Sequence, residues 1–398
     1  MTSPLPASST PQRCLHFGEC GGCDRLDRAY PRQLLDKRDA VARLLGAHLG
    51  GLDLVCELPP RAPMHTRIKL SWPILPDAQR GLRLGMYRRG THEVLDILEC
   101  RIQDPSLTRI AKRAVDVFRD LRLSPYDEIA QRGTLRAFHA RLTPSTGELM
   151  LGVTTRGGTF PEGRALADGL FQAAGGLRDA KGKPLRTAGV MRSIRDEPGN
   201  ALLGGRHLPL RGRDHQVEQV AGLRFRLSFG SFWQNHRDSE RVLYRPALAL
   251  LGDLRGLRIV DGYGGVGAFG LRLARAGAAK VTIVESNPHA CADARDNAAT
   301  NALPAVDVVQ VPFAAFRSDT DVDLAVVDPP RAGLSVEGVA TLLALKPKRI
   351  LCVACDARAF SRDLALLHDG GYRIRAARIA DLFPHTEHVE LLAVLERD

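Results

Sequence analysis

Four apolar stretches near the end of the chain constrain its fold more than any other feature. They are GLRIVDGYGG, AKVTIVES, VDLAVVDPP and KRILCVAC, which begin at residues 256, 279, 322 and 348. Each has the length and the β-branched content of a buried strand, and a helical pattern follows each of them. This alternation is typical of a parallel, doubly wound sheet. We therefore expect an α/β domain of Rossmann-like topology over residues 229–398.

The end of the chain departs from the alternation. Residues 371–398 read GYRIRAARIADLFPHTEHVELLAVLERD, which predicts two strands joined by a connection that contains proline. We expect these strands to pair antiparallel. Such a terminal pair is typical of methyltransferase sheets rather than of dinucleotide dehydrogenases, which is an argument from fold alone.

The turn after the first of the four strands is rich in glycine. The stretch VDGYGGVGAFGLRLA carries glycines that let the backbone turn tightly and let a ligand approach, namely Gly262, Gly264, Gly265 and Gly267. Asp261 ends the strand, and Glu285 ends the next strand 24 residues later, where a carboxylate can bind ribose hydroxyls. The combination predicts a nucleoside-bearing cofactor. NAD and S-adenosylmethionine both fit, although G-Y-G-G-V-G is not the G-x-G-x-x-G spacing.

The third stretch ends in DPPRAG, from Asp328 to Gly333. A Pro-Pro pair at this place predicts a rigid loop beside the reacting centre, although Asp-Pro-Pro can also be a plain turn. Many methyltransferases that modify exocyclic amino groups place an aromatic residue after the two prolines to stack the base. Arg331 stands there instead, which argues against amino-nitrogen chemistry.

The fourth stretch holds two cysteines. Cys352 lies inside the apolar run and is expected to be a core residue, whereas Cys355 ends the strand directly before a helix. The positive end of a helix dipole lowers the pKa of a nearby thiol. Ligands of open α/β sheets bind at the carboxyl ends of the strands. Cys355 is therefore a candidate nucleophile.

Three more cysteines lie near the N-terminus in CLHFGECGGC. Cys14, Cys20 and Cys23 have the spacing C-x5-C-x2-C, one thiolate short of a closed metal site. Cys100 is the candidate for the fourth ligand, and Cys56 is a weaker one because it lies inside an apolar run. The spacing alone allows either zinc or an iron–sulfur cluster.

The net charge of +11 indicates a polyanionic partner, although an arginine bias of the genome gives the same excess. Between about 60 and 228 the sequence predicts short strands, and the basic residues on them are expected to face a phosphate backbone: Arg67, Lys69, Arg83, Arg88, Arg89, Arg136 and Arg141. We expect no signal peptide, because the first residues lack its pattern, and no apolar run is long enough to span a membrane. We expect a cytoplasmic protein with a disordered tail over 1–12, a cluster-bearing, strand-rich α+β region over 13–228, and the α/β domain.

These motifs together resemble the RNA uracil-5-methyltransferases. SFWQN, DGYGGVGAFGL, DLAVVDPPRAGL, CVACDARAFSRDL and FPHTEHVELL occur in the order found in that family. CLHFGECGGC, RIKLSW and LGMYRRGTHEVLDILECRI are similar to its iron–sulfur members. The resemblance implies a class I methyltransferase that uses S-adenosylmethionine. It also implies a [4Fe-4S] cluster held by Cys14, Cys20, Cys23 and Cys100.

The resemblance also implies roles for single residues. Cys355 is the nucleophile that adds to carbon 6 of uracil, Glu390 is the base that removes the proton from carbon 5, and Asp328 lies near the target base. The cofactor is expected to contact Gln234, Asp261, Gly262, Tyr263, Gly265, Gly267, Glu285 and Asp328. The chain resembles the branch that modifies 23S ribosomal RNA without an N-terminal TRAM domain, and we expect a monomer that acts on that RNA. Transfer RNA is the alternative substrate, and a catalytically silent RNA-binding protein is the alternative function.

Three departures from the family stand out. Gly264 replaces a common cysteine that is not the nucleophile. Asp356 replaces a common asparagine after the nucleophile; it can raise the pKa of the thiol or cap the following helix, and we favour the cap. The usual acidic residue after the third strand is missing from VVQVPFAAF, which leaves adenine recognition open.

Overall fold

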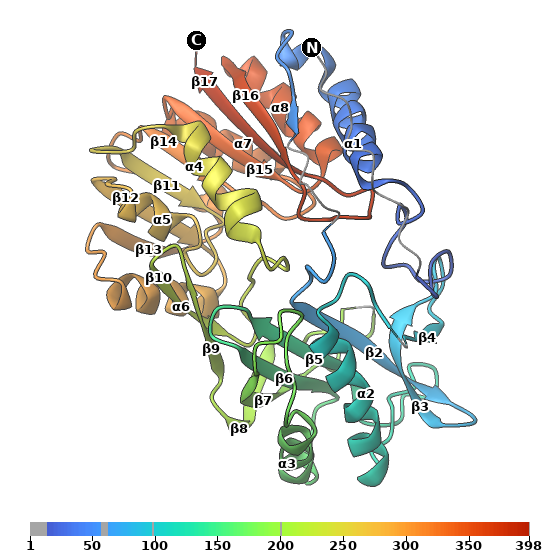
Figure 1. The fold of residues 1–398 in the computed structure, drawn as a ribbon. Coiled ribbons are helices and arrows are strands. Elements are labelled where there is room, and N and C mark those ends of the chain that lie inside the picture. The colour runs from blue at the N-terminus through green and yellow to red at the C-terminus, as the bar shows by residue number, and fades with distance from the viewer. Residues whose placement is uncertain (1–13, 57–62, 98, 200, 398) are drawn as a thin grey trace.

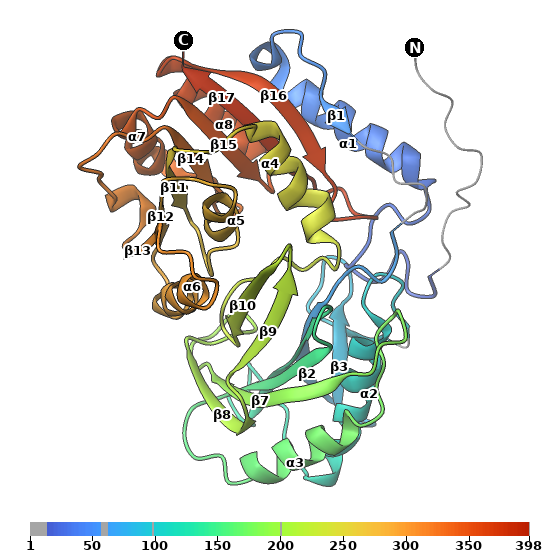
Figure 2. The ribbon, with the colours of Figure 1, turned by 60° about the vertical axis from the view of Figure 1, so that its left-hand side comes forward.

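The computed structural model describes residues 14–56, 63–97, 99–199 and 201–397, and the predicted tail over 1–12 lies outside them. The chain forms two large sheets, of which the C-terminal one is at the top of Figure 1 and the central one at the bottom. A two-stranded hairpin lies between them (Figure 2), made of β9 (His215–Val220) and β10 (Leu223–Ser228).

The C-terminal sheet has the strand order β1-β16-β17-β15-β14-β11-β12-β13. Its strands are β1 (Val55–Cys56), β11 (Arg258–Gly262), β12 (Lys280–Glu285), β13 (Val306–Gln310), β14 (Leu324–Val327), β15 (Arg349–Ala354), β16 (Tyr372–Ala380) and β17 (Glu390–Arg397). Its helices are α4 (Arg245–Leu251), α5 (Gly270–Arg275), α6 (Pro288–Thr300), α7 (Ser335–Leu345) and α8 (Ala357–Asp369), with short turns η2 (Glu240–Tyr244) and η3 (Phe313–Ala315).

The expected doubly wound sheet is confirmed. Strands β11 to β15 pair parallel, because a helix or a helical turn carries the chain back between successive strands. The antiparallel terminal pair is confirmed as well, since β17 inserts between β15 and β16 and pairs antiparallel with both. This is the α/β fold class that the sequence predicts.

Two elements from the beginning of the chain join this sheet. Helix α1 (Tyr30–Leu45), followed by η1 (Gly46–Leu49), packs against α8, and β1 pairs parallel with β16 at Arg378 and Ile379. Val41 and Leu45 of α1 are buried in the core of the C-terminal domain, because they form an apolar stripe that needs a covering face. We propose that the chain divides into a region over 13–228 and a domain over 229–398. Helix α1 and strand β1 lie in the first range but pack with the second.

The central sheet has the order β4-β3-β2-β5-β6-β7-β8. Its strands are β2 (Lys69–Asp77), β3 (Gly81–Tyr87), β4 (Val94–Asp96), β5 (Leu135–Thr143), β6 (Glu148–Thr155), β7 (Arg186–Ile194) and β8 (Arg206–Gly212), and its helices are α2 (Pro105–Asp120) and α3 (Gly163–Ala173). Neighbouring strands pair antiparallel except β6 and β7. The two helices pack on this sheet, as Figure 1 shows.

The expectation that the basic strand residues face a phosphate backbone is wrong for the two on β5. Arg141 is 5% exposed and donates to the Gln216 side chain at 2.7 Å and to the carbonyl of Ser231 at 3.0 Å. Arg136 is also buried, where it donates to two carbonyls and pairs with Glu128. Both guanidinium groups satisfy buried carbonyl oxygens, so neither is free to bind RNA.

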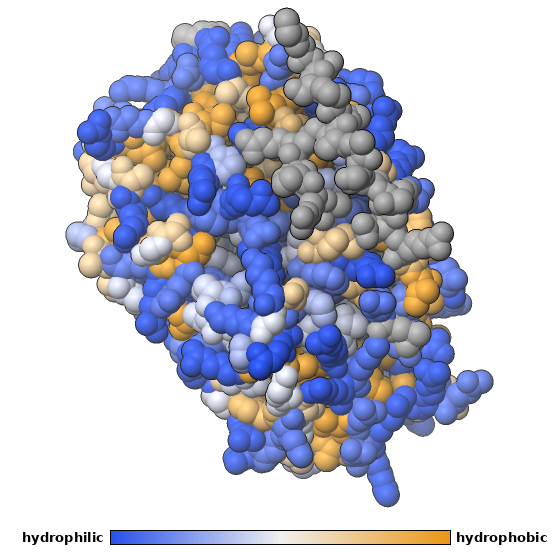
Figure 3. Space-filling model, viewed as in Figure 1, coloured by the Kyte–Doolittle hydropathy of each residue, from blue (hydrophilic) through white to orange (hydrophobic). Residues whose placement is uncertain are grey.

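Hydrophilic and hydrophobic residues are mixed on the surface of the molecule. In the view of Figure 3, hydrophilic side chains cover much of the region between the two sheets, and hydrophobic ones are scattered over the whole face. Within the described residues, none of the helices has both the length and the apolar composition needed to cross a bilayer.

Candidate active site

The carboxyl edge of the C-terminal sheet gathers the predicted reactive groups. Asp328 follows β14 and Cys355 follows β15, and these two parallel strands are neighbours in register. Glu390 begins β17, which runs antiparallel to β15 with Leu391 opposite Ala354. Continued by one residue, that register places Glu390 opposite Cys355, and the Glu390 carboxylate is among the charges that act on the thiol. The structure thus brings together three residues that are far apart in the sequence.

Burial dominates the electrostatics of the two carboxyl groups. Glu390 is 2% exposed, and its Oε1 has no hydrogen-bond partner among the described residues. Burial and the neighbouring Asp328 carboxylate raise the pKa of Glu390 well above its usual range, against the opposing charge of Arg331. Burial raises the pKa of Asp328 to about 7. Both carboxyl groups therefore keep their protons at pH values at which exposed carboxyl groups have released theirs.

The expectation that the helix terminus lowers the pKa of Cys355 is wrong for this structure. Burial, together with Glu390 and Asp328, raises the pKa of the thiol to about 11, and Arg331 opposes the shift. Asp356 caps the following helix, because its carboxylate accepts from the N–H groups of Arg358 and Ala359, both at 2.9 Å. The predicted cap is therefore confirmed, and it occupies donors at the start of α8.

The glycine turn after β11 has positive φ angles that glycine adopts freely and that are strained at a single non-glycine residue, Tyr263. Gly265 and Gly267 have φ of 55° and 85°, and Tyr263, which is not a glycine, has φ of 59°. The Tyr263 hydroxyl donates to the carbonyl of Leu334 at 3.2 Å, which holds this conformation. Glu285 accepts from the N–H of Gly265 at 3.0 Å, so the acid of β12 also shapes the turn. Such outliers are typical of ligand sites.

Asp261 has one carboxyl oxygen without a partner. It is 1% exposed, and its Oδ2 accepts from the N–H of Gly270 at 2.7 Å, whereas Oδ1 has no hydrogen-bond partner among the described residues. Burial, with Asp328 and Glu285 nearby, raises its pKa to about 8. A buried orphan oxygen at the ligand edge of the sheet fits a polar contact to a bound cofactor.

The turn has no room for the cysteine that the family often carries at 264. A Cβ on Gly264 would lie 2.6 Å from the Cγ2 of Ile283 and 3.0 Å from the carbonyl oxygen of Asp261. Contacts this short require neighbouring atoms to move. The glycine at 264 therefore leaves room for the Ile283 side chain on the adjacent strand.

The SFWQN segment connects the two sheets. Gln234 is buried, and the next residue, Asn235, accepts from the N–H groups of Ile68 and Lys69 at 2.9 and 2.7 Å. Asp293 of α6 accepts from the hydroxyl of Ser231 at 2.6 Å. Sequence reasoning missed Asn235 and Asp293. The signal available for Asp293 was an acidic residue on the face of α6 that also carries the buried alanines Ala290 and Ala294.

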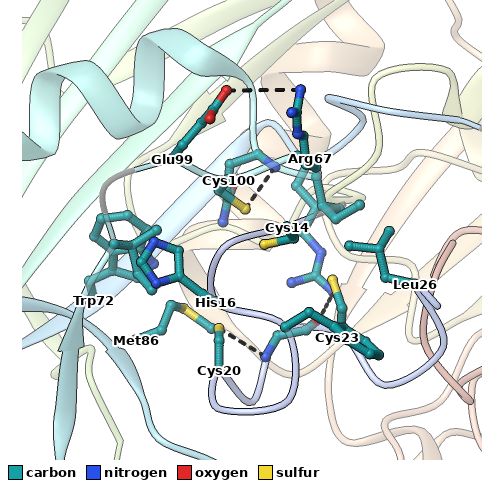
Figure 4. A pocket seen from close by; sticks show the side chains of 16 residues that line it. Cys14, His16, Cys20, Cys23, Leu26, Arg67, Trp72, Met86, Glu99 and Cys100 are labelled. Carbon is teal, nitrogen blue, oxygen red and sulfur yellow. Dashed lines mark hydrogen bonds and ion pairs between the residues drawn. The ribbon is translucent and has the colours of Figure 1, made fainter. Parts of the chain in front are cut away.

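The four N-terminal cysteines that the sequence predicts as ligands line one pocket, which Figure 4 shows with Cys14, Cys20, Cys23 and Cys100 around the same space. The N–H of Gly22 donates to the sulfur of Cys20 at 3.3 Å, and the N–H of Gln103 donates to the sulfur of Cys100 at 3.4 Å. Arg67 also lines the pocket. Among the described residues, no three His, Cys, Asp or Glu side chains are placed to hold a single metal ion.

Cys56, the weaker candidate, lies apart from these four. It is on β1, paired with β16 of the C-terminal sheet, and burial raises the pKa of its thiol to about 11. The pocket therefore joins CLHFGECGGC to Cys100 and not to Cys56.

Comparison with known proteins decides the family. The family described as tRNA (uracil-5-)-methyltransferase matches residues 215–398. An uncharacterized RNA methyltransferase of Halalkalibacterium halodurans is 30% identical over 391 residues, which are 96% of this chain and 82% of the relative. The chain belongs to the RNA uracil-5-methyltransferase family. A second uncharacterized RNA methyltransferase, from Caldanaerobacter subterraneus, is 30% identical over 390 residues, 96% of this chain and 84% of the relative.

A solved structure agrees with this RNA uracil-5-methyltransferase assignment. It is the Pyrococcus abyssi tRNA (uracil-54, C5)-methyltransferase in complex with S-adenosyl-L-homocysteine, with a TM-score of 0.74 and 25% identity over 95% of this chain and 86% of that one. The resemblance to the RNA uracil-5-methyltransferase family that was stated from the sequence is confirmed. The enzyme is an RNA methyltransferase that depends on S-adenosylmethionine.

Proposed function

We propose that this RNA uracil-5-methyltransferase modifies a uridine of 23S ribosomal RNA, acting as a monomer in the cytoplasm. The observation that carries the proposed chemistry is the meeting of Cys355, Asp328 and Glu390 at the carboxyl edge of the sheet. A thiol beside two buried carboxyl groups supplies both the nucleophile and the base that substitution at an unreactive ring carbon needs.

Cys355 is proposed to activate the base. Its sulfur bonds to carbon 6 of uracil, and the electrons of the ring double bond move to the carbonyl at carbon 4, which makes carbon 5 nucleophilic. The thiol proton passes to a nearby carboxylate, and Asp328, with a pKa near 7, can hold a proton at neutral pH. S-Adenosylmethionine supplies the methyl group that carbon 5 attacks.

Glu390 is proposed to complete the reaction. It takes the proton from carbon 5, the double bond forms again, and the thiolate leaves carbon 6. In its ionised form, a carboxylate with a raised pKa is a stronger base than an exposed one, so burial suits Glu390 to this step once it has lost its own proton. The target uridine must leave its stack to reach Cys355, which costs least in single-stranded RNA.

The cofactor is proposed to lie over the glycine turn. The orphan oxygen of Asp261 and the strained turn from Tyr263 to Gly267 support this placement. The residues proposed to contact the cofactor are Gln234, Asp261, Gly262, Tyr263, Gly265, Gly267, Glu285 and Asp328.

The four cysteines around the pocket of Figure 4 are proposed to bind a [4Fe-4S] cluster. The donor set fits, because such clusters take one cysteine thiolate at each iron and accept N–H···S hydrogen bonds such as those to Cys20 and Cys100. The methyl transfer involves no oxidation or reduction. The proposed role of the cluster is therefore to fold the N-terminal segment and to position RNA.

The choice of RNA rests on the sequence resemblance, and transfer RNA is the second candidate. The family description and the Pyrococcus abyssi structure both name tRNA. The test uses 23S rRNA or bulk tRNA from cells that lack the enzyme. Each RNA is incubated with the enzyme and methyl-labelled S-adenosylmethionine, and its nucleosides are then analysed. We expect label in 5-methyluridine from 23S rRNA. If label appears only in tRNA, the substrate is tRNA and not 23S rRNA. Label on an exocyclic nitrogen would refute methylation at carbon 5.

A further inference from the structure

The loop between β16 and β17 is tied to helix α1 by a buried ion pair. The Nζ of Lys37 lies 2.7 Å from the Oδ1 of Asp381, and it also donates to the carbonyl of Phe383 at 2.9 Å. The hydroxyl of Tyr30 donates to the Oδ2 of Asp381 at 2.6 Å. Lys37 is 1% exposed. Both oxygens of Asp381 thus have partners on α1, more than 340 residues earlier in the chain.

The same loop is held a second time at its middle, at His385. This residue has φ of 65°, which is rare outside glycine. Its carbonyl accepts from the N–H groups of Asp24 and Arg25, at 3.2 and 3.1 Å, and its ring hydrogen-bonds Gln33 and the carbonyl of Pro63. A strained backbone persists only where its surroundings over-determine it. Contacts from the segment 24–37 supply most of that constraint.

The loop leads directly into Glu390. In the register of β16 and β17, Ala380 lies opposite Glu390, so residues 381–389 form the closed end of this pair. A shift of the loop would move the first residue of β17 and with it the carboxyl group opposite Cys355. Among the described residues, Oε1 of Glu390 has no hydrogen-bond partner, so this oxygen does not anchor the carboxyl group independently of the backbone.

We propose that Tyr30, Lys37 and Asp381 are positioning residues for Glu390, acting through the loop 381–389. This inference rests on the proposed role of Glu390 as the base. Asp24 directly follows Cys23, so a cluster bound at Cys23 would fix the end of the segment that holds His385. The N-terminal segment then contributes to proton removal although none of it belongs to the α/β sequence pattern.

The chemistry supplies a readout that a loss of stability does not imitate. Proton removal follows methyl transfer, so a displaced Glu390 leaves the methylated base bonded to Cys355. Labelled 23S rRNA and tRNA transcripts are incubated with S-adenosylmethionine, quenched in denaturant and resolved on a gel that separates free RNA from protein-bound RNA. We expect Asp381→Asn to raise the bound fraction about tenfold over wild type, with Tyr30→Phe raising it less, because small misplacements of a catalytic group cost large factors in rate.

Two variants serve as controls. Glu390→Gln must accumulate the same adduct. If it does not, the proposed role of Glu390 as the base is wrong, and the experiment does not reach the positioning role. Lys348→Met removes another Lys–Asp pair, to Asp323 at 2.9 Å, away from the loop, and we expect it to leave the bound fraction at the wild-type level. If Glu390→Gln accumulates adduct while Asp381→Asn and Tyr30→Phe do not, the positioning role is wrong.

Amide hydrogen exchange tests the same inference without turnover. We expect faster exchange in the peptide 381–389 of Asp381→Asn, and also of the wild-type enzyme after removal of its iron, with the peptide of α7 unchanged. Unchanged exchange at 381–389 in Asp381→Asn would overturn the link between α1 and the loop. Unchanged exchange after iron removal would overturn the contribution of the cluster.

Discussion

Replacing Glu390 by glutamine keeps the size of the side chain and removes its ability to accept and release a proton. General base catalysis contributes about 10²- to 10⁴-fold to a rate, which corresponds to about 3–5 kcal/mol of activation free energy. We therefore expect Glu390→Gln to slow product formation by that factor. Methyl transfer to carbon 5 precedes proton removal, and its rate should change far less.

The stability of the same variant should depend on pH with a fixed sign. Because the pKa of Glu390 is raised in the folded protein, the folded state binds the proton more tightly than the unfolded chain. The wild type therefore loses stability as the pH rises above the ordinary value of 4.5. The glutamine variant escapes this loss. Its new buried amide costs about 1–3 kcal/mol if unpaired, and that cost does not vary with pH.

Two assays separate these effects. Single-turnover kinetics with RNA and S-adenosylmethionine measure methyl transfer and product release, and urea unfolding at several pH values gives the difference in free energy of unfolding. We expect slow release with nearly normal methyl transfer, and a stability difference that moves in favour of the variant from pH 5 to pH 9. Normal turnover by Glu390→Gln would refute its role as base, and a pH-independent difference would refute the raised pKa.

Three other residues give further tests. Asp356→Ala should cost about 1 kcal/mol in the free energy of unfolding, because the α8 cap is lost, and an unchanged urea midpoint would contradict this. Cys100→Ser should lose visible absorbance and bound iron in anaerobically purified protein, whereas Cys56→Ser should keep both; equal iron in the two variants would contradict the ligand set. Arg141→Met should lower stability without changing the salt dependence of RNA binding, and a shallower salt slope would show that Arg141 contacts phosphate.

The sequence predicts the C-terminal sheet well because each of its strands is a short apolar run between helical patterns. The same logic places Asp328 and Cys355 at one edge, since parallel strands share their carboxyl ends. The added strand β1 could not be predicted. It has only two residues, and it pairs with Arg378 and Ile379 more than 300 positions later, so the short apolar run around Cys56 does not show which strand it joins.

The errors share a cause, which is burial. Arg141 alternates on a strand as an exposed residue does, but the hairpin β9–β10 and the SFWQN segment cover that face and give its guanidinium group carbonyl partners. Cys355 stands at a helix N-terminus as expected, but its own burial, together with two neighbouring carboxyl groups, raises the pKa of its thiol. Sequence periodicity shows which residues alternate and does not show which other element covers them.

The central claim is that Cys355 bonds to carbon 6 of a uridine during methyl transfer. Fluorine at carbon 5 cannot leave as a proton does, so RNA that contains 5-fluorouridine should stop the reaction at the covalent adduct. With S-adenosylmethionine present, we predict a denaturation-resistant complex between the wild-type enzyme and this RNA, and mass spectrometry should place the bond on Cys355. No complex with the wild type, or an undiminished complex with Cys355→Ala, would contradict the mechanism.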